Sequence, residues 1–334
     1  MSAGPEILFA RDGLPRLAAR LGELGTRRAL ILAAPSRRFV DRATAALAAY
    51  EPAVFDGAKV HVPRDVVDAA DARLAEARAD TLVAVGGGAA VGLGKALRLS
   101  HDVRFAAVPT TYAGSEMTSM YGITSGNEKT TGRDPRVRPD LVLYDATLSA
   151  TLPVALTVQS LLNGLAHVAS VLSTGSLDGD DRARALDAAV AVDRAIDTLH
   201  AMPTSLDARE AALRAASAAG LAADRGRFGA QHALAHLLGG GLGLDHAALH
   251  AVLLPHFLHH LATASPEVVA ALAGVLGTAD VAGHVHDLLV RAGAPVSLDA
   301  LGADPAAVER LVATRPELPA RIARDAQRGR RPGA

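Results

Sequence analysis

The pattern of apolar residues changes once along this chain, near Pro153, and this change constrains the fold more than any other feature. Before Pro153, short apolar runs alternate with amphipathic stretches, which is typical of a parallel sheet flanked by helices. After it, helical periodicity is almost continuous. We therefore expect an α/β domain over residues 1–150 and an all-helical domain over residues 151–334. A chain of 334 residues, half of them apolar, can bury a core in each domain.

The first half predicts the elements of a doubly wound, nucleotide-binding domain. The expected strands are Ala29–Leu32, Ala53–Phe55, Thr81–Val85, Phe105–Val108 and Leu141–Tyr144, and the expected helices are Arg37–Ala49, Pro63–Ala77 and Ala89–Leu99. In such open sheets ligands bind outside the carboxyl ends of the strands. Functional residues of this half are therefore expected in the loops that follow the strands.

Charge and composition exclude several classes of function. The formal charge is −1 and no basic run occurs, so we expect a small-molecule partner, with no nucleic acid and no membrane surface. No apolar stretch reaches the roughly 18 residues of a spanning helix, and Met1–Arg11 lacks the order of an export signal, so a cytoplasmic location is expected. Cysteine is absent, which excludes disulfides, thiolate metal ligands and a cysteine nucleophile. The chain also lacks a Gly-x-Ser-x-Gly elbow, which disfavours serine hydrolases.

A glycine run, Gly86-Gly87-Gly88 followed by Ala89, lies between a predicted buried strand and a predicted helix. Glycines there let backbone N–H groups approach a phosphate at the start of the helix. The run matches neither G-x-G-x-x-G nor a Walker loop, so by itself it indicates either phosphate binding or tight packing. We expect Lys95, on the same helix, to be solvated rather than to contact phosphate.

A second polar loop follows the strand Phe105–Val108. It contains Thr110, Thr111 and Ser115, whose hydroxyls and backbone N–H groups could hold a pyrophosphate or an amide at the carboxyl edge of the sheet. A simple turn would have the same composition. Lys129 lies in the next polar stretch.

Histidines are concentrated in the helical half. Three polar pairs are spaced four residues apart, which places both members of each pair on one helix face: Asn163 with His167, His232 with His236, and His246 with His250. Such a cluster is suited to metal binding or proton transfer. We expect His256, His259 and His260, which fall on several faces of one helix, to be structural or exposed.

Taken together and in order, these motifs resemble the maleylacetate reductases of the iron-containing alcohol dehydrogenase superfamily. The similar segments are Gly86–Ala96, Val108–Thr118, Lys129-Thr130-Thr131, Asn163–His167 and His232–Gly240, and the similarity extends from about Gly13 to Pro255. The resemblance implies a dehydroquinate synthase-like fold of two domains with the active site in the cleft between them. It also implies a homodimer.

The resemblance further implies which residues carry out the reaction. NADH or NADPH would lie across the glycine run and the second loop, with these cofactor-binding residues: Gly86, Gly87, Gly88, Ala89, Thr110, Thr111, Ser115 and Lys129. His236 would lie beside the nicotinamide. Metal-dependent relatives hold iron or zinc at the positions of Asn163, His167, His232 and His246. Because maleylacetate reductases carry Asn in the first position, we expect no metal.

The leading hypothesis is hydride transfer from NAD(P)H to a small conjugated oxo-acid or carbonyl compound. His236, and secondarily His246 and His167, would provide a proton or a hydrogen bond to the developing oxyanion. Departures from the reductase pattern leave the substrate open: Ala89, Ser170, Gln231, Ala233 and Ala235 replace Ser, Glu, His, Lys and Cys.

Three alternatives remain. They are a metal-dependent alcohol dehydrogenase, a non-redox lyase or cyclase on the same scaffold, and a partner subunit that binds no cofactor. The turn Ala33-Ala34-Pro35-Ser36 does not distinguish NADH from NADPH.

Overall fold

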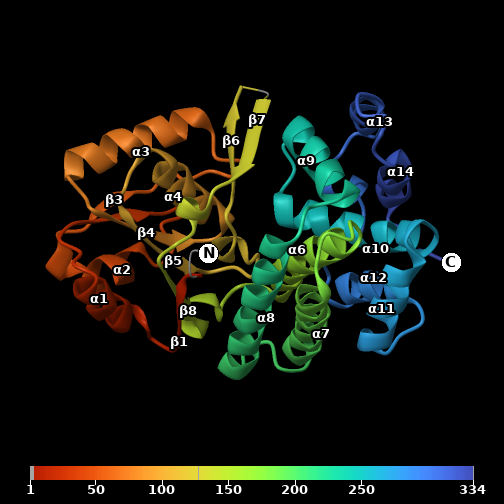
Figure 1. Cartoon of the computed structure of the whole chain (residues 1–334), viewed down its shortest axis with the longest axis horizontal. Helices are drawn as coiled ribbons and strands as arrows, with labels where there is room; N and C mark the ends of the chain where they lie inside the picture. The colour runs from red at the N-terminus through yellow and green to blue at the C-terminus, as the bar shows by residue number, and fades with distance from the viewer. Residues whose placement is uncertain (1–3, 127, 334) are drawn as a thin grey trace. The chain divides into compact units, whose positions relative to one another are not determined.

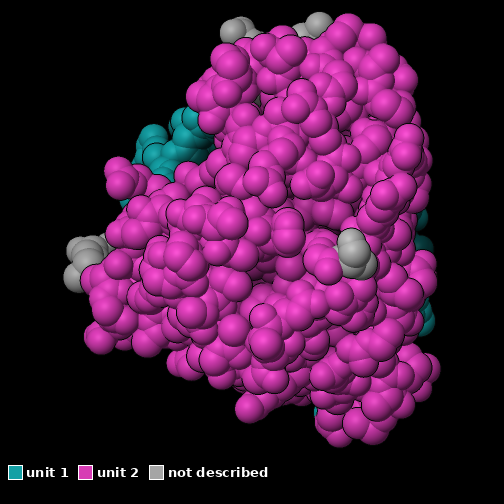
Figure 2. Space-filling model, turned by 90° about the vertical axis from the view of Figure 1, so that its right-hand side faces the viewer, with its two compact units in different colours: residues 1–111, 115–151 teal, residues 112–114, 152–334 magenta. Residues whose placement is uncertain are grey.

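The computed structural model describes residues 4–126 and 128–333, which form two compact units (Figure 1). Unit 1 comprises Met1–Thr111 and Ser115–Thr151, and unit 2 comprises Tyr112–Gly114 and Leu152–Ala334. Figure 2 shows the residues of each unit in its own colour. The division after Thr151 is one residue from the boundary expected from the sequence. The transfer of Tyr112–Gly114 to unit 2 was not expected.

Unit 1 contains a six-stranded parallel sheet with the order β1-β8-β5-β4-β2-β3. Its strands are β1 (Glu6–Ala10), β2 (Ala29–Leu32), β3 (Ala53–Phe55), β4 (Thr81–Gly86), β5 (Arg104–Pro109) and β8 (Leu141–Asp145). Five of them lie where the sequence predicts strands. The edge strand β1 was not predicted, because a strand that is only partly buried has a weak apolar pattern.

Helices cover both faces of this sheet. On one face, α1 (Leu14–Glu23) and α2 (Val40–Ala46) pack against side chains of the strands, including Ile31, Val83 and Val108. On the other, α3 (Arg64–Ala77) and α4 (Gly88–Ser100) pack together and against the strands. The helix α2 is shorter than predicted and is followed by the 3₁₀ turn η1 (Ala48–Tyr50). It begins late because Arg37 and Phe39 have φ angles of 51° and 67°, which an α-helix excludes.

The polar stretch after β5 is not a simple loop. It contains the 3₁₀ turn η2 (Ser115–Met117) and an antiparallel hairpin of β6 (Met120–Ser125) and β7 (Glu128–Arg133), which is visible in Figure 1. The 3₁₀ turn η3 (Pro135–Val137) and the helix α5 (Ala146–Ser149) complete unit 1. The short polar strands of the hairpin lack the apolar alternation that would have predicted them.

The expectation that Lys95 is solvated is wrong. Its side chain is 2% exposed, and its Nζ donates hydrogen bonds to Ser115 O (2.6 Å), Thr118 Oγ1 (2.8 Å) and Met120 O (2.8 Å). A buried ammonium requires such acceptors, because an unpaired buried charge is costly. Lys95 therefore holds the segment between β5 and β6 against α4.

Unit 2 is helical, as predicted. Its helices are α6 (Val154–Leu172), α7 (Gly179–Ala201), α8 (Leu206–Arg225), α9 (Ala230–Leu242), α10 (His246–Ala264), α11 (Pro266–Leu276), α12 (Val281–Arg291), α13 (Pro305–Ala313) and α14 (Ala320–Arg328), with the 3₁₀ turn η4 (Asp299–Leu301). The two central helices are α6 and α10, which pack against each other, and each contacts several further helices. Their facing side chains form the interior of the unit.

The expectation that no apolar stretch is long enough to span a membrane fails for α6. The helix α6 has 19 residues and a mean hydropathy of 1.4, so by length and composition it could cross a membrane. However, 78% of this stretch is buried inside the protein. Its apolar surface is used in packing against neighbouring helices, as expected of a core helix.

Three consecutive glycines, Gly239–Gly241, do not interrupt α9. They lie inside α9, which continues to Leu242 and ends at Gly243 with a φ of 66°. A Cβ at Gly241 would lie 2.6 Å from Leu311 Cδ1, so glycine allows α13 to approach α9 closely. The connection to α10 is consequently only three residues long.

His256 on α10 makes the stability of unit 2 depend on pH. It is 4% exposed, and burial lowers its pKa from 6.5 to about 4. Between the unfolded pKa of 6.5 and the folded pKa of about 4, the unfolded chain binds a proton at His256 that the folded chain excludes. The free energy of unfolding therefore decreases as the pH falls through this range. We expect a loss of about 2 kcal/mol from His256 between pH 7 and pH 5.

This prediction can be checked by urea denaturation of the parent and of His256→Leu at both pH values. The variant should show a smaller difference between pH 7 and pH 5 by that amount. His259→Leu, at an exposed position on the same helix, serves as the control and should keep the parent's difference. Equal pH differences in all three proteins would contradict the assignment.

Candidate functional site

The glycine run forms a turn between β4 and α4 in unit 1. Gly86 has a φ of 152°, which side chains rarely allow, and a Cβ at Gly87 would lie 3.0 Å from Thr111 Cγ2. In contrast, a Cβ at Gly88 would meet no atom within 4 Å. Gly88 is the first residue of α4, and the N-cap Gly87 provides no side-chain cap. The start of this helix thus presents N–H groups to open space, as phosphate-binding turns do.

Thr110 and Thr111 lie beside this turn, as the sequence predicts. Thr110 N donates to Gly86 O (3.0 Å), which ties the ends of β4 and β5 together. Ser115 begins η2, and its carbonyl accepts from Lys95. Ala89 lies in the first turn of α4 and is partly buried. The backbone of Lys129 pairs with Thr124 in the β6–β7 hairpin, and its side chain lies outside the described part of the chain.

Tyr112–Gly114, the three residues that follow Thr111, are fixed within unit 2. Tyr112 N donates to Ser160 Oγ (2.9 Å), and a Cβ at Gly114 would lie 2.5 Å from Ala216 O. Arg209, a fully buried side chain, donates to Thr157 Oγ1 (2.7 Å) and Leu152 O (2.8 Å), and to Tyr112 OH (3.4 Å). These contacts fix the backbone conformation directly after the predicted cofactor loop.

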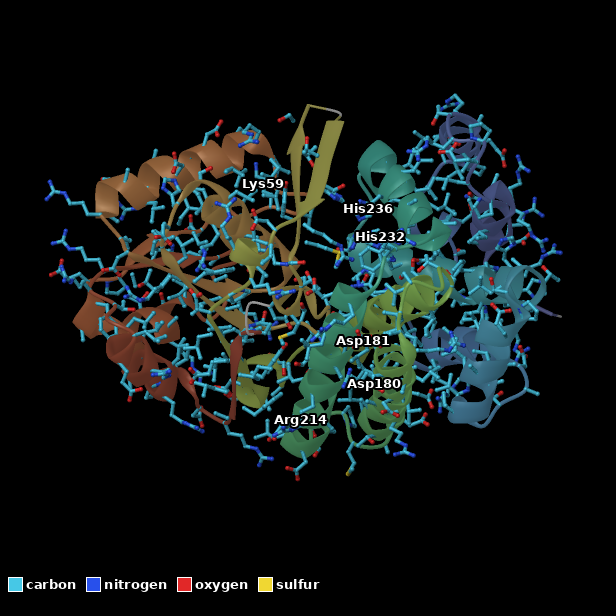
Figure 3. All side chains as sticks on the ribbon, viewed as in Figure 1. Lys59, Asp180, Asp181, Arg214, His232 and His236 are labelled. Carbon is cyan, nitrogen blue, oxygen red and sulfur yellow. The ribbon has the colours of Figure 1, made fainter. Side chains whose placement is uncertain are left out.

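Five imidazole rings from three helices meet in unit 2. His167 lies on α6, His232 and His236 on α9 (Figure 3), and His246 and His250 on α10. The structure therefore brings together all four predicted catalytic histidines and adds His250. Asn163 lies one turn before His167 on α6 and is buried, and its Oδ1 has no hydrogen-bond partner among the described residues.

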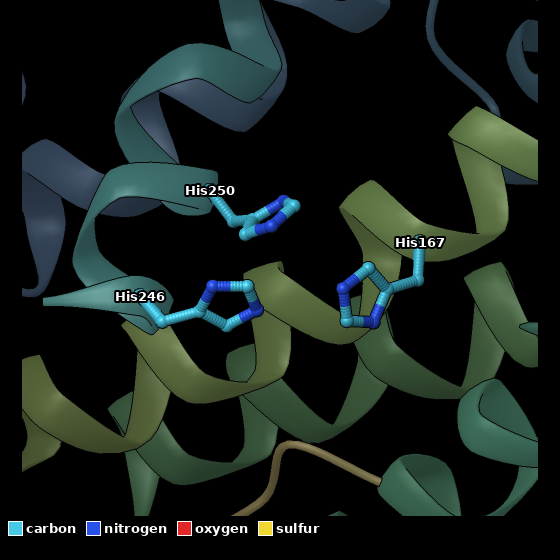
Figure 4. A group of neighbouring side chains, drawn as sticks. All are labelled: His167, His246 and His250. Carbon is cyan, nitrogen blue, oxygen red and sulfur yellow. The ribbon is translucent and has the colours of Figure 1, made fainter. Parts of the chain in front are cut away.

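The rings are in direct contact. The ring centroids of His246 and His250 are 4.4 Å apart, and those of His167 and His250 are 4.9 Å apart. Figure 4 shows these three side chains pointing toward one another from two helices. On α9 the His232 and His236 rings are 4.2 Å apart, and His232 stacks on Phe228 at 3.8 Å.

Helix ends place these rings. The Asp245 side chain caps α10 by accepting from Ala248 N (2.9 Å), which fixes His246 as the first helical residue. Ser170 Oγ accepts from Gly229 N (2.8 Å) at the start of α9, next to the turn that carries His232. Ser170, a departure from the reductase pattern, therefore links α6 to α9.

Burial makes two of the five imidazoles weak bases. Burial lowers the pKa of His167 to about 4. The pKa of His250 is lowered well below 6.5, first by burial and then by the neighbouring rings, of which His246 is the largest contributor. At neutral pH these two side chains are uncharged, and each carries a lone pair that can accept a proton or bind a metal ion.

His250 lies inside the cluster, although the sequence-based prediction gave it no catalytic role. Its side chain is fully buried, and its Nδ1 lies 3.0 Å from Gln231 Nε2 and 3.2 Å from Gln231 Oε1. Its Nε2 has no hydrogen-bond partner among the described residues. The four-residue spacing from His246 was the signal for including it, but the family pattern gave it no role.

The donors of this cluster fit a divalent metal ion. Two groups have ligand atoms within 4.8 Å of one another, namely His167, His246 and His250, and His232, His236 and His250. Buried nitrogens without hydrogen-bond partners, on His167 and His250, are available as ligands. The expectation of no metal considered only Asn163 and three histidines, and this geometry gives it no support.

A cavity of about 760 Å³ lies elsewhere in unit 2, lined by α10, α13, α14 and the residues that follow α14. Its lining includes Arg321, Arg324 and Arg328, and none of the five histidines of the cluster. Chemistry that depends on the five clustered histidines is therefore not expected in this cavity, which is lined by His256 and His259 instead.

Comparison with solved structures identifies the architecture. A putative alcohol dehydrogenase from Ralstonia eutropha JMP134 is 34% identical with a TM-score of 0.93, covering 99% of this chain and 98% of that one. Maleylacetate reductase from Agrobacterium tumefaciens is 33% identical with a TM-score of 0.89, with the same coverage of each chain. The fold is thus the dehydroquinate synthase-like fold of nicotinamide-dependent oxidoreductases, as predicted.

The chain belongs to the iron-containing alcohol dehydrogenase family. The model of iron-containing alcohol dehydrogenase matches residues 4–146, and that of the C-terminal part of the Fe-containing alcohol dehydrogenase family matches residues 157–317. Maleylacetate reductase 1 of Cupriavidus pinatubonensis is 39% identical, covering 92% of this chain and 87% of that protein. Maleylacetate reductase of Burkholderia cepacia is 38% identical, covering 89% and 85%. The predicted NAD(P)H-dependent oxidoreductase and its resemblance to maleylacetate reductases are confirmed.

Gly88 offers a sharp test of the turn after β4. We expect Gly88→Val to weaken NAD(P)H binding about 100-fold, because two lost hydrogen bonds to a charged phosphate contribute roughly 3 kcal/mol. The free protein should keep its stability, since no atom lies within 4 Å of the added Cβ. Fluorescence titration with NADH and NADPH and a thermal melt provide the two measurements.

Gly179→Val is the matched control. Gly179 is also the first residue of a helix, α7, and also has open space around its Cβ position. Its substitution should change neither cofactor affinity nor melting temperature. Unchanged cofactor affinity in Gly88→Val would show that the phosphates bind elsewhere.

Proposed function

We propose that this chain reduces a small, carbonyl-conjugated oxo-acid of the maleylacetate type. The observation that carries the proposal is the cluster of His167, His232, His236 and His246, whose rings lie 4.2 to 6.2 Å apart in successive contacts and to which the resemblance to maleylacetate reductases assigns the reaction. Relatives that are 38% to 39% identical over about nine tenths of the chain carry that name.

The cofactor-binding residues of this proposal lie in unit 1. Gly86, Gly87, Gly88 and Ala89 would bind the phosphates through backbone N–H groups, and Thr110, Thr111, Ser115 and Lys129 would complete the cofactor site. Open space at Gly88 and the uncapped start of α4 support this assignment. When bound, NAD(P)H supplies the hydride. A cytoplasmic location and a homodimer are part of the same proposal.

The histidines would stabilise and protonate the anion that forms on the substrate. Hydride addition to a conjugated double bond leaves an enolate, whose oxygen needs a hydrogen bond and whose carbon needs a proton. His236, partly buried on α9, would donate to this anion. Partial burial limits access of water, which strengthens such a hydrogen bond.

Gln231 and Ser170, which depart from the reductase pattern, have structural roles next to the cluster. Each forms hydrogen bonds that hold the cluster, Gln231 to His250 and Ser170 to Gly229. They can therefore replace the His and Glu of the reductases without entering the reaction. The proposal that no metal takes part has no such support, and the metal-dependent dehydrogenase remains the second candidate because of the histidine donor groups.

The function is tested by titrating the full-length protein with NADH and NADPH and then adding maleylacetate. We expect saturable cofactor binding and consumption of the reduced cofactor only when the conjugated oxo-acid is present. Saturated alcohols with NAD⁺ test the metal-dependent dehydrogenase in the same assay. Cofactor binding without turnover of either substrate class would favour a non-redox enzyme, and absence of binding would favour a partner subunit.

His236→Ala should lower turnover by about 100- to 10,000-fold, the usual effect of losing a proton-transfer group. Cofactor affinity should change far less, because in this proposal the phosphates are bound by backbone N–H groups of the glycine run and not by His236. Steady-state kinetics and NADH titration separate the two effects. His259→Ala, at an exposed position outside the cluster, is the control and should retain the parent's turnover. A normal rate in His236→Ala would reduce His236 to a packing residue.

A further inference from the structure

The cavity of about 760 Å³ in unit 2 takes no part in the proposed reduction, yet its volume lies in the range of small-molecule sites, roughly 300 to 1,000 Å³. Its walls include the helices α13 and α14, which lie side by side (Figure 1). Apart from Pro305, Pro332 and Gly333, every lining residue is polar or charged, which disfavours an uncharged apolar ligand. Five arginines and three acids line it, so positive charge is in excess.

Two of the arginines are neutralised and hold the walls in place. Arg324 Nε and Nη2 donate to the two carboxylate oxygens of Glu309 at 2.8 and 2.9 Å, which joins α14 to α13. Arg331 pairs with Asp280 at 2.7 Å and with Asp287 at 3.0 Å, which ties the residues after α14 to α12. The walls are therefore fixed by protein contacts, before any ligand is bound.

The other three arginines of the lining are not neutralised. Within residues 4–126 and 128–333, Arg321, Arg328 and Arg330 have no carboxylate within 4.0 Å, although all three are exposed. Arg321 and Arg328 are seven residues apart, a spacing that places both side chains on one face of α14. These guanidinium groups leave hydrogen-bond donors free for a ligand.

His256 provides a second, independent indication of a ligand. It lies on α10, lines the same cavity, is 4% exposed, and its Nε2 has no hydrogen-bond partner in the described part of the chain. Burial lowers the pKa of His256 to about 4, and Asp325 on α14 opposes this lowering, so the imidazole lies on the side of α10 that faces α14. A buried polar atom without a partner costs free energy unless a ligand satisfies it.

We propose that this cavity binds a small anion with two or more negative charges, a phosphate ester or a polycarboxylate, through Arg321, Arg328 and Arg330. Guanidinium groups match the geometry of phosphate and carboxylate and bind both through paired hydrogen bonds. His256, neutral with its proton on Nε2, donates a further hydrogen bond from α10. The site uses none of the five clustered histidines and no cofactor-binding residue, so it goes beyond the proposed reductase activity.

The experiment must separate this cavity from the glycine run, which is also expected to bind phosphate. Full-length Gly88→Val, whose glycine run is blocked, is titrated by isothermal calorimetry with pyrophosphate and with citrate, and sodium chloride of equal ionic strength is the blank. We expect one equivalent of a multivalent anion to bind. The tighter of the two probes identifies the ligand as a phosphate ester or a polycarboxylate. The parent, titrated in parallel, should show the same site.

Substitutions in both backgrounds then identify the binding residues. Arg321→Gln and Arg328→Gln should each weaken anion binding about 10-fold, because each loses hydrogen bonds to a charged group, and His256→Leu should have an effect of similar size. Arg194→Gln is the matched control, since Arg194 is an exposed arginine on α7 that does not line the cavity. The anion should raise the melting temperature of Gly88→Val and of the control, but not that of the combined Arg321→Gln and Arg328→Gln variant.

Three results would overturn the proposal. Binding that is unchanged in Arg321→Gln and Arg328→Gln would place the anion outside this cavity. An equal loss in Arg194→Gln would show unspecific attraction to surface charge. If neither the parent nor Gly88→Val binds either probe more tightly than about 1 mM at this position, the cavity is not an anion site. None of these measurements requires turnover, so failure of the reductase proposal would leave them unchanged.

Discussion

The helices α6, α9 and α10 of unit 2 meet at five contacting imidazoles, of which the buried rings of His167 and His250 are kept uncharged. Burial holds the pKa of His167 near 4 and that of His250 well below 6.5, because a proton on either ring would lack solvent, and on His250 it would also face the neighbouring rings. The rings come from three helices, so α6, α9 and α10 must be fixed to one another. Next to the cluster, the bond from Gly229 N to Ser170 Oγ links the start of α9 to α6, and the contact between Gln231 and His250 links α9 to α10.

The candidate site of unit 2 is built from side chains, whereas the candidate cofactor turn of unit 1 relies on backbone atoms. Gly86 adopts a φ of 152°, and the position of a Gly88 side chain is open space, so the turn exposes N–H groups without any side-chain donor. The absent hydroxyl at Ala89 matters less for such a turn. Two ionisable side chains of unit 1 are buried. Lys95 lies under the segment that begins at Ser115, and burial raises the pKa of the neighbouring Glu116.

The sequence predicted the features that repeat along the chain and missed those that depend on distant contacts. Buried strands such as β4 and β5, and the change to helices after Pro153, have a periodicity that a single sequence reveals. The burial of Lys95 and the continuation of α9 through Gly239–Gly241 depend on partners far away in the sequence, so no local pattern indicated them. The spacing from His246 placed His250 near the cluster, but its burial and its contact with Gln231 depend on the packing of α9 against α10.

Proton transfer and metal binding compete for the same lone pairs, and the cluster is large enough to separate them. A histidine that holds zinc through one nitrogen cannot also act as an acid at that atom. If His167, His246 and His250 hold the ion, two histidines of the cluster remain, and His232 is stacked on Phe228. His236, whose ring lies 5.5 Å from that of His246, is then the imidazole left to donate a proton. The reductase and the metal-dependent dehydrogenase therefore give His246 and His167 different roles, as secondary proton donors in the first and as metal ligands in the second.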